Sequence, residues 1–152
     1  MSITSSKNKE LRSFIHRVKV DEAWMSNTKG LTYNLTKKIS NSCNDVLDIG
    51  KSSRELFNLF KKDQITTFDI NQFKDYPDYI VDVCDINTYP DLKFDGIICH
   101  SILEHTYDPF SAVKNLSTVL KSNGIFLGFV PFLMEYHAPK DLKFQDFYRF
   151  SR

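Results

Sequence analysis

Three aspartates, Asp48, Asp69 and Asp85, stand at or just past the ends of short apolar stretches of the chain. A carboxylate accepts several hydrogen bonds at once, so Asp69 suits the hydroxyls of a ribose and Asp85 suits the amino group of an adenine. Gly50 lets the backbone come close to a ligand without strain. These residues predict a site for a nucleoside-containing ligand. The plainer interpretation is that each aspartate caps its own turn.

Five apolar segments must position these side chains, and their length and composition are typical of buried parallel strands. They are Asp45–Gly50, Ile65–Ile70, Tyr79–Val83, Phe94–Cys99 and Ile125–Val130. Open α/β sheets bind their ligands at the carboxyl ends of the strands, so the three aspartates are expected along one edge. The stretch after the fourth segment adds further polar groups to that edge, namely His100, Glu104 and His105.

Helical periodicity fills the intervals between these strands. Two N-terminal helices are predicted over Glu10–Trp24 and Lys29–Ile39, the second with an apolar face made of Leu31, Leu35 and Ile39. Ser52 or Ser53 is expected to cap a helix after the first strand, with apolar residues at Leu56, Phe57, Leu59 and Phe60.

Two further helices are predicted in the second half of the chain. Asp108 and Pro109 begin one that ends at Asn123 and Gly124, with an inner face of Phe110, Val113, Leu116 and Leu120. Near the C-terminus, phenylalanines at a spacing of three predict a short amphipathic helix through Phe144, Phe147 and Phe150.

The chain has 152 residues, a length that suits one domain. Lysine and arginine total 20 against 19 acidic residues, so a net charge of +1 gives no long-range attraction to nucleic acid or to an anionic membrane. There is no run of eighteen apolar residues and no signal peptide, and we expect a cytoplasmic protein. Three cysteines without a CxxC pair, and the lack of HxH or HExxH, predict reduced thiols and no metal.

Several motifs occur in the order that is familiar from one enzyme family. They are DVLDIG, TFDIN, VCDINTYPDLKFDGIICHSILEHTYDP, LKSNG and IFLGFVPF. This order resembles class I S-adenosylmethionine-dependent methyltransferases of the type 11 group. The resemblance implies an α/β fold with a Rossmann-like, doubly wound and mostly parallel sheet of strand order 3-2-1-4-5 in residues 44–152. A tail and helices are expected to precede it in residues 1–43.

The same resemblance implies roles for individual residues. Asp48 and Gly50 border the methionine part of S-adenosylmethionine, and Asp69 holds the ribose. Asp85 and Ile86 then hold the adenine, while the backbone at the end of the fourth strand lines the cofactor pocket. The full set of implied cofactor-binding residues is Asp48, Ile49, Gly50, Ser52, Asp69, Ile70, Asp85, Ile86 and His100.

The chain departs from the family pattern at two places. The turn DxGxGxG reads DIGKSSR here, with Ser52 and Arg54 where further glycines are expected. The family fold continues past the fifth strand to an antiparallel hairpin, which this sequence lacks, so we expect a truncated domain with an open apolar edge. A homodimer that covers this edge is one expectation.

The implied activity is methyl transfer to a small molecule, such as a sugar or a cell-envelope metabolite. One alternative is a non-catalytic, methyltransferase-like domain that binds a partner, and the altered glycine turn favours it. A dinucleotide-dependent oxidoreductase is a weaker alternative because GxGxxG is absent.

Two histidines are candidates for a general base in such an enzyme, His105 and His137, because an imidazole titrates near neutral pH. A structural role for His105 stays open. Tyr148 and Arg149 are expected to wall the substrate pocket, with the guanidinium offering a planar fork to a carboxylate or phosphate. A salt bridge between Asp146 and Arg149 is the alternative.

Overall fold

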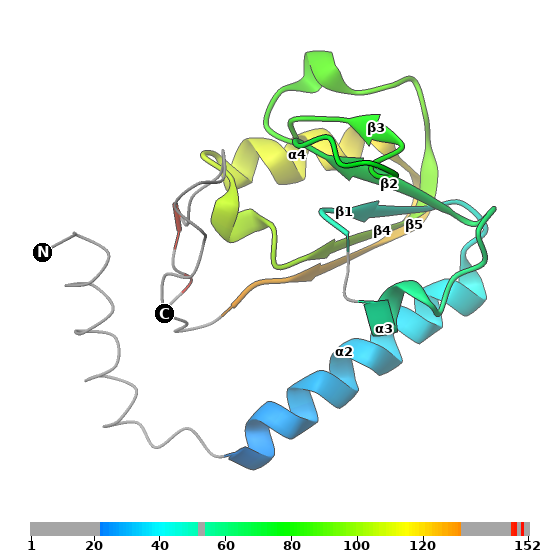
Figure 1. The fold of residues 1–152 in the computed structure, drawn as a ribbon, viewed down its shortest axis with the longest axis vertical. Helices are drawn as coiled ribbons and strands as arrows, with labels where there is room; N and C mark the ends of the chain where they lie inside the picture. The colour runs from blue at the N-terminus through cyan, green and yellow to red at the C-terminus, as the bar shows by residue number, and fades with distance from the viewer. Residues whose placement is uncertain (1–21, 52–53, 132–146, 149, 151–152) are drawn as a thin grey trace, which may run out of the picture.

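The structure is a computed structural model that describes residues 22–51, 54–131, 147–148 and 150. Its centre is a five-stranded parallel sheet in the order β3-β2-β1-β4-β5 (Figure 1), which confirms the predicted α/β Rossmann-like fold and strand order. The strands are β1 (Val46–Ile49), β2 (Ile65–Asp69), β3 (Tyr79–Ile80), β4 (Phe94–His100) and β5 (Leu120–Phe129). The helices are α2 (Glu22–Ser42), α3 (Arg54–Phe57) and α4 (Pro109–Val119), with 3-10 turns η1 (Ile86–Thr88) and η2 (Leu103–His105).

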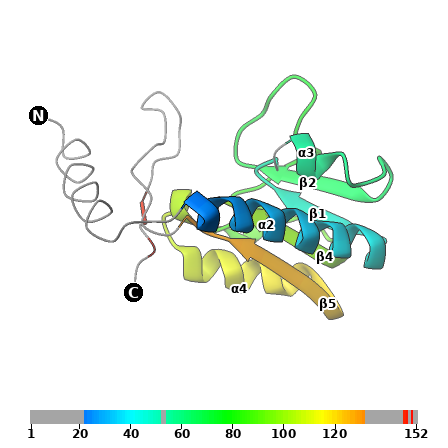
Figure 2. The same cartoon turned by 90° about the horizontal axis from the view of Figure 1, so that it is seen from below.

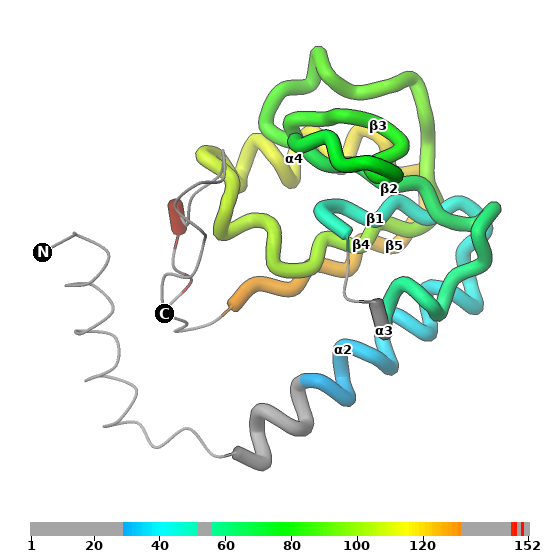
Figure 3. The backbone as a smooth tube through the Cα atoms, in the orientation of Figure 1, coloured from blue at the N-terminus to red at the C-terminus, as the bar shows by residue number. Residues whose placement is uncertain are grey.

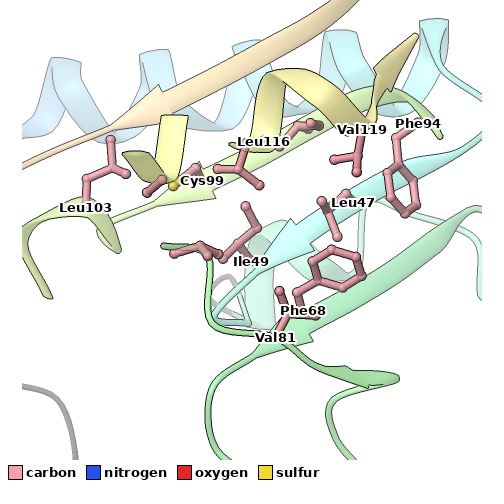
Figure 4. Close-up of a cluster of buried hydrophobic side chains, with 12 residues drawn as sticks. Leu47, Ile49, Phe68, Val81, Phe94, Cys99, Leu103, Leu116 and Val119 are labelled. Atoms are coloured by element: carbon pink, nitrogen blue, oxygen red, sulfur yellow. The ribbon is translucent and has the colours of Figure 1, made fainter. Parts of the chain in front are cut away.

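Alternate residues of the strands pack against helices on opposite faces of the sheet, which α4 and α2 cover (Figure 2). Side chains of α4 join the larger apolar cluster, shown in Figure 4 with Leu47, Ile49, Phe68, Val81, Phe94, Cys99, Leu103, Leu116 and Val119 labelled. On the other face, Ile39 of α2 and Cys43, which follows the helix, pack with Val46 and Ile98. All four residues of β1 are buried, so the strand that carries the first site candidates lies at the centre of the fold.

The start of α4 agrees with its prediction, because Asp108 accepts hydrogen bonds from the backbone of Phe110 and Ser111 and Pro109 opens the helix. The predicted inner face is wrong in part. Phe110 is 82% exposed and Val113 is 41% exposed. The residues that face the sheet are Ala112, Leu116 and Val119, since a period of 3.6 residues places positions four and seven apart on one side.

The predicted boundary between this helix and the last strand is also corrected. The helix ends at Val119 and β5 begins at Leu120, so Asn123 and Gly124 lie inside the strand rather than at a helix end. The register with β4 shifts there, because Phe94 pairs with Leu120 whereas Gly96 pairs with Ile125. Asn123 has a φ of 66°. The turn-forming pair therefore makes an irregularity in the strand.

The second N-terminal helix is longer than predicted, since α2 runs without a break over Glu22–Ser42. Its buried face is also different. Leu31 is 55% exposed, whereas Thr32, Thr36 and Ile39 are buried. The buried side of α2 therefore includes threonines, which hydropathy alone would not place on a buried face. The first predicted helix, Glu10–Trp24, lies mostly outside the described residues.

Other elements are shorter or different from their predictions. β3 contains only Tyr79 and Ile80, and α3 spans only Arg54–Phe57, after which the chain continues in turns. Phe147 and Tyr148 have irregular backbone and Phe150 forms an isolated bridge, so these residues do not form the predicted helix. No helix within residues 22–51, 54–131, 147–148 and 150 is long and apolar enough to cross a membrane.

Candidate functional site

A cavity of about 130 Å³ opens at the carboxyl ends of β1 and β2, the edge to which the sequence assigns the ligand. Four stretches of chain line it: the ends of β1 and β2, the segment after β3, and the loop between β4 and α4. The lining residues are Ile49, Gly50, Asp69, Ile70, Val81, Asp82, Val83, Cys84, Ile102, His105, Thr106 and Tyr107. The ladder between parallel strands brings these distant segments together.

Gly50 forms the turn that ends β1, and its φ of 68° is a conformation that favours glycine. Its N–H donates to the carbonyl of Phe68 at 2.8 Å, which ties the turn to β2. A Cβ atom at this position would lie 2.0 Å from Cδ1 of Ile102. The glycine therefore lets the turn and the opposite loop approach each other at the cavity.

Asp69 ends β2 and lines the cavity beside Gly50. Its Oδ1 accepts a hydrogen bond from the backbone N–H of Asn71 at 2.8 Å, so the carboxylate does cap its own turn. A carboxylate offers about four acceptor positions, and this hydrogen bond uses one of them. Capping the turn and binding a ribose are thus compatible roles for Asp69.

A buried tyrosine lies close to this carboxylate. Tyr76 is 8% exposed and its hydroxyl donates to the carbonyl of Phe68 at 3.3 Å. Burial raises the pKa of this hydroxyl, and the charges of Asp69 and Asp48 raise it further. Lys51, the residue after the glycine turn, places Nζ 5.2 Å from the centre of the Tyr76 ring.

The segment after β3 contributes Asp82, Val83 and Cys84 to the cavity. Oδ1 of Asp82 accepts the N–H of Cys84 at 2.9 Å, which holds this stretch in a turn. Burial raises the pKa of the Cys84 thiol, and the thiol donates to the carbonyl of Asp108 at 3.3 Å. The contact joins this segment to the N-terminus of α4.

Asp85 and Ile86 are both described, yet neither lines the cavity. The Asp85 carboxylate caps η1 instead, accepting the backbone N–H of Asn87 at 3.0 Å and its side-chain amide at 2.9 Å. Ile86 is 45% exposed. The structure therefore shows the turn-capping role for Asp85, and the role in adenine binding stays a prediction.

The loop after β4 forms the opposite wall with Ile102, His105, Thr106 and Tyr107. Within it, Glu104 is fully buried, and one of its carboxylate oxygens lies 3.8 Å from Nε2 of His105. His105 is thus the one of the two predicted base candidates that the structure describes, and it faces the cavity. His137 lies outside the described residues, as do Ser52 and Arg149.

Two other predicted residues lie near the site without lining it. Asp48 is fully buried in β1, paired with Thr67 on one side and Ile98 on the other. His100 ends β4, its ring centre 5.3 Å from that of Phe129, and burial lowers its pKa. The role predicted for His100, to line the cofactor pocket, uses its backbone atoms.

Phe147 and Tyr148, drawn near the C-terminus in Figure 3, contact the wall made by the loop after β4. The N–H groups of Phe147 and Tyr148 both donate to the carbonyl of Glu104, at 2.8 and 3.1 Å. The hydroxyl of Tyr148 also donates to the carbonyl of Tyr107 at 3.2 Å. Tyr148 therefore contacts the residues of the cavity wall but does not itself line the cavity.

A family model for a methyltransferase domain of the type 11 group matches residues 46–128. The matched segment begins with the first residue of β1 and ends one residue before the end of β5, so it includes the whole edge that holds the cavity. The chain belongs to the class I methyltransferases of the type 11 group. A comparison with curated proteins finds no match.

Methyltransferase domains of this class generally bind S-adenosylmethionine, and the residues present fit such a ligand. Gly50 provides the close backbone approach and Asp69 the carboxylate beside it. Within the described parts of the chain, no three histidine, cysteine, aspartate or glutamate side chains gather as metal ligands would.

Sequence reasoning missed the residues of the cavity that come from loops, above all Asp82, Cys84, Ile102 and Tyr107. Asp82 was placed inside the predicted third strand, Tyr79–Val83, whereas β3 ends at Ile80 and Asp82 follows it. Tyr107 precedes the predicted helix start and looks like an ordinary loop residue. Nothing in its local sequence indicates that it turns toward the cavity.

Proposed function

We propose that the chain transfers a methyl group from S-adenosylmethionine to a small-molecule acceptor. The observation that carries the proposal is the cavity at the carboxyl ends of β1 and β2, where Gly50 and Asp69 lie together inside a segment that matches the methyltransferase domain. A ligand at this edge is what an open parallel sheet favours. Asp69 is assigned to the ribose hydroxyls, and Gly50 to the approach of the backbone.

The volume of the cavity suits one part of the donor and not the whole molecule. Pockets that enclose a whole ligand usually measure roughly 300–1,000 Å³, and this cavity measures about 130 Å³. Its lining is mostly apolar apart from Asp69, Asp82, His105 and Thr106, which suits a nucleoside. We assign the cavity to the adenosine half, with the methionine half extending past Gly50.

The donor supplies an activated methyl group when it is bound. The chain's own residues hold the donor, exclude water from the apolar lining, and orient the acceptor for in-line attack. His105 is the proposed general base, because it faces the cavity and Glu104 lies 3.8 Å from its Nε2. The acceptor class we propose is a small metabolite such as a sugar or an envelope precursor, and the protein is proposed to act in the cytoplasm.

The test is a calorimetric titration of the full chain with S-adenosylmethionine and S-adenosylhomocysteine. We expect micromolar binding by the wild type and a loss of about 10-fold or more in Asp69→Ala, since one or two charge-assisted hydrogen bonds are each worth about 1.5–3 kcal/mol. Asp91→Ala is the control, because Asp91 is an exposed carboxylate outside the cavity. A folded wild type that binds neither ligand would overturn the proposal and favour a partner-binding domain.

Turnover is tested with the same protein and a panel of small acceptors. We expect His105→Gln to lower kcat by about 100-fold or more and to affect donor affinity much less, as for loss of a general base. Equal kcat in wild type and variant would remove His105 from the reaction without affecting the donor assignment.

A further inference from the structure

The cavity has one aromatic side chain in its lining, Tyr107, within the described residues. It comes from the loop between η2 and α4 and is 55% exposed, a high value for a ring at the edge of an apolar cavity. Desolvation raises the pKa of its hydroxyl, and the charge of Asp82 adds to this effect. Tyr107, from the loop wall, and Asp82, from the segment after β3, thus line the same cavity.

An exposed aromatic ring at this place suits a flat ligand. Every nucleobase has a face that stacks on an aromatic side chain, and such a contact is worth about 1–3 kcal/mol. Ile70 and Val83 supply apolar surface in the same cavity. A ring that lies over a base would bury the part of Tyr107 that is now exposed.

The backbone of Tyr107 is held from both sides. The next residue, Asp108, is the cap of α4, and its carboxylate accepts N–H groups from the first turn of the helix. From the C-terminal segment, the hydroxyl of Tyr148 donates to the carbonyl of Tyr107 at 3.2 Å. Three residues earlier, the carbonyl of Glu104 accepts the N–H groups of Phe147 and Tyr148.

These contacts come from outside the part of the chain that matches the family. Residues 147 and 148 follow the matched segment 46–128, and Tyr148 is 41 residues from Tyr107 in the sequence. This wall is thus held in part by residues that the domain match does not include.

We propose that Tyr107 covers the nucleoside part of the bound donor, and that Tyr148 is the positioning residue that holds Tyr107 for this contact. The inference rests on the proposed function, because it takes the donor to be the ligand of this cavity. It assigns a donor-contacting role to a loop residue, and a role in donor affinity to the C-terminal segment.

The first part of the test compares donor affinity among variants at the ring itself. We expect Tyr107→Ala to weaken S-adenosylhomocysteine binding by about 10- to 100-fold, and Tyr107→Phe to stay within about threefold of the wild type because the ring is kept. The control is Phe110→Ala, which removes a ring that is 82% exposed and is absent from the cavity lining. Circular dichroism confirms that each variant is folded.

The second part uses a double-mutant cycle to separate positioning from a general structural effect. Tyr148→Phe removes only the hydroxyl, and we expect a loss of about 2- to 10-fold in affinity, the range for one hydrogen bond. In the Tyr107→Ala background the same change should have no effect, because the ring that it positions is gone. Tyr33→Phe, on α2, is the matched control.

The outcomes separate this inference from the proposed function. If Asp69→Ala loses the donor while Tyr107→Ala binds like the wild type, the function stands and the inference is overturned. If Tyr148→Phe weakens binding equally in both backgrounds, its effect is structural and the positioning role is overturned. A wild type that binds no donor overturns both.

Discussion

The two walls of the cavity are built in different ways. The wall made by β1 and β2 is part of the sheet: its turn is tied by the N–H of Gly50 to Phe68, and Asp69 accepts the N–H of Val81 at 2.9 Å. The wall made by Ile102 to Tyr107 contains a single 3-10 turn, and the C-terminal segment supports it through three hydrogen bonds. One wall is set by strand pairing and the other by contacts between residues far apart in sequence.

This difference between the walls predicts how substitutions in each should affect stability and binding. A parallel ladder fixes backbone positions through many mutually dependent hydrogen bonds, so damage to it affects the whole domain. A short turn that is held by a few bonds can move with little effect on global stability. Changes in the sheet wall should therefore lower both stability and binding, whereas changes in the loop wall should chiefly affect binding and local opening.

The largest expected effect tests the sheet wall at its turn. Gly50→Ala places a Cβ 2.0 Å from Cδ1 of Ile102 and forces a non-glycine residue to a φ of 68°. We expect the free energy of unfolding to fall by about 1–3 kcal/mol, measured by urea denaturation. Displacement of the Ile102 side chain should also weaken donor binding.

Gly30→Ala is the matched control for that change, because a Cβ at Gly30, inside α2, meets nothing within 4 Å. It should raise stability by up to about 1 kcal/mol, as for glycine in a helix interior. Equal stabilities for the two variants would show that the turn at Gly50 is not strained by a side chain.

A smaller effect tests the core beneath the sheet wall through pH. Burial raises the pKa of the Cys99 thiol from 9.0 to about 12, and the charges of Glu104 and Asp48 add to the effect. Between these values the unfolded chain loses the proton while the folded chain keeps it. This loss of stability is therefore absent below pH 9. Above pH 9 the free energy of unfolding falls by about 1.4 kcal/mol per pH unit.

Urea denaturation at pH 8, 9 and 10 measures this slope. Other groups also titrate in that range, so the comparison is with Cys99→Ala, whose stability should fall less steeply above pH 9. Parallel curves for wild type and variant would mean that the thiol ionises as easily in the folded state as in the unfolded one.

The smallest expected effect on stability tests the loop wall. Phe147→Pro removes the N–H that donates to the carbonyl of Glu104 at 2.8 Å, while the N–H of Tyr148 still donates there. We expect unfolding to become easier by about 0.5–1.5 kcal/mol. Amide hydrogen exchange within residues 102–107 should rise more than exchange in β1.

Phe147→Ala is its control, because alanine also removes the ring, which is 50% exposed, but keeps the N–H. The difference between the two variants isolates the hydrogen bond. Equal exchange in β1 and in residues 102–107 would mean that the two walls open together, contrary to the comparison.

Much of the fold could be predicted because strands carry their own signal. All five strands were placed to within one residue at one end at least, and the start of α4 followed from Asp108 and Pro109. The errors concerned which face of a helix is buried and where helices and strands end. Phe110 was assigned to the core by its hydropathy, but the helix turns it to solvent.

The site was predictable where it depends on strand ends. Ile49 and Asp69 end β1 and β2, Gly50 and Ile70 follow them, and all four line the cavity. Asp85 was a reasonable candidate by the same rule, yet its carboxylate caps η1, because a side-chain amide and a backbone N–H two residues away are nearer partners. A local hydrogen bond of this kind competes with any role at the cavity.

The sequence by itself determined the buried strands and the presence of carboxylates along one edge, because apolar strands and turn residues are local signals, and the resemblance of its motifs to the family implied the strand order. The tertiary structure alone decided which groups face the cavity from the other side. The place of Tyr107 depends on a hydrogen bond from Tyr148, 41 residues away. Contacts over such separations leave no periodicity in the sequence, since they form only after the sheet has brought the segments together.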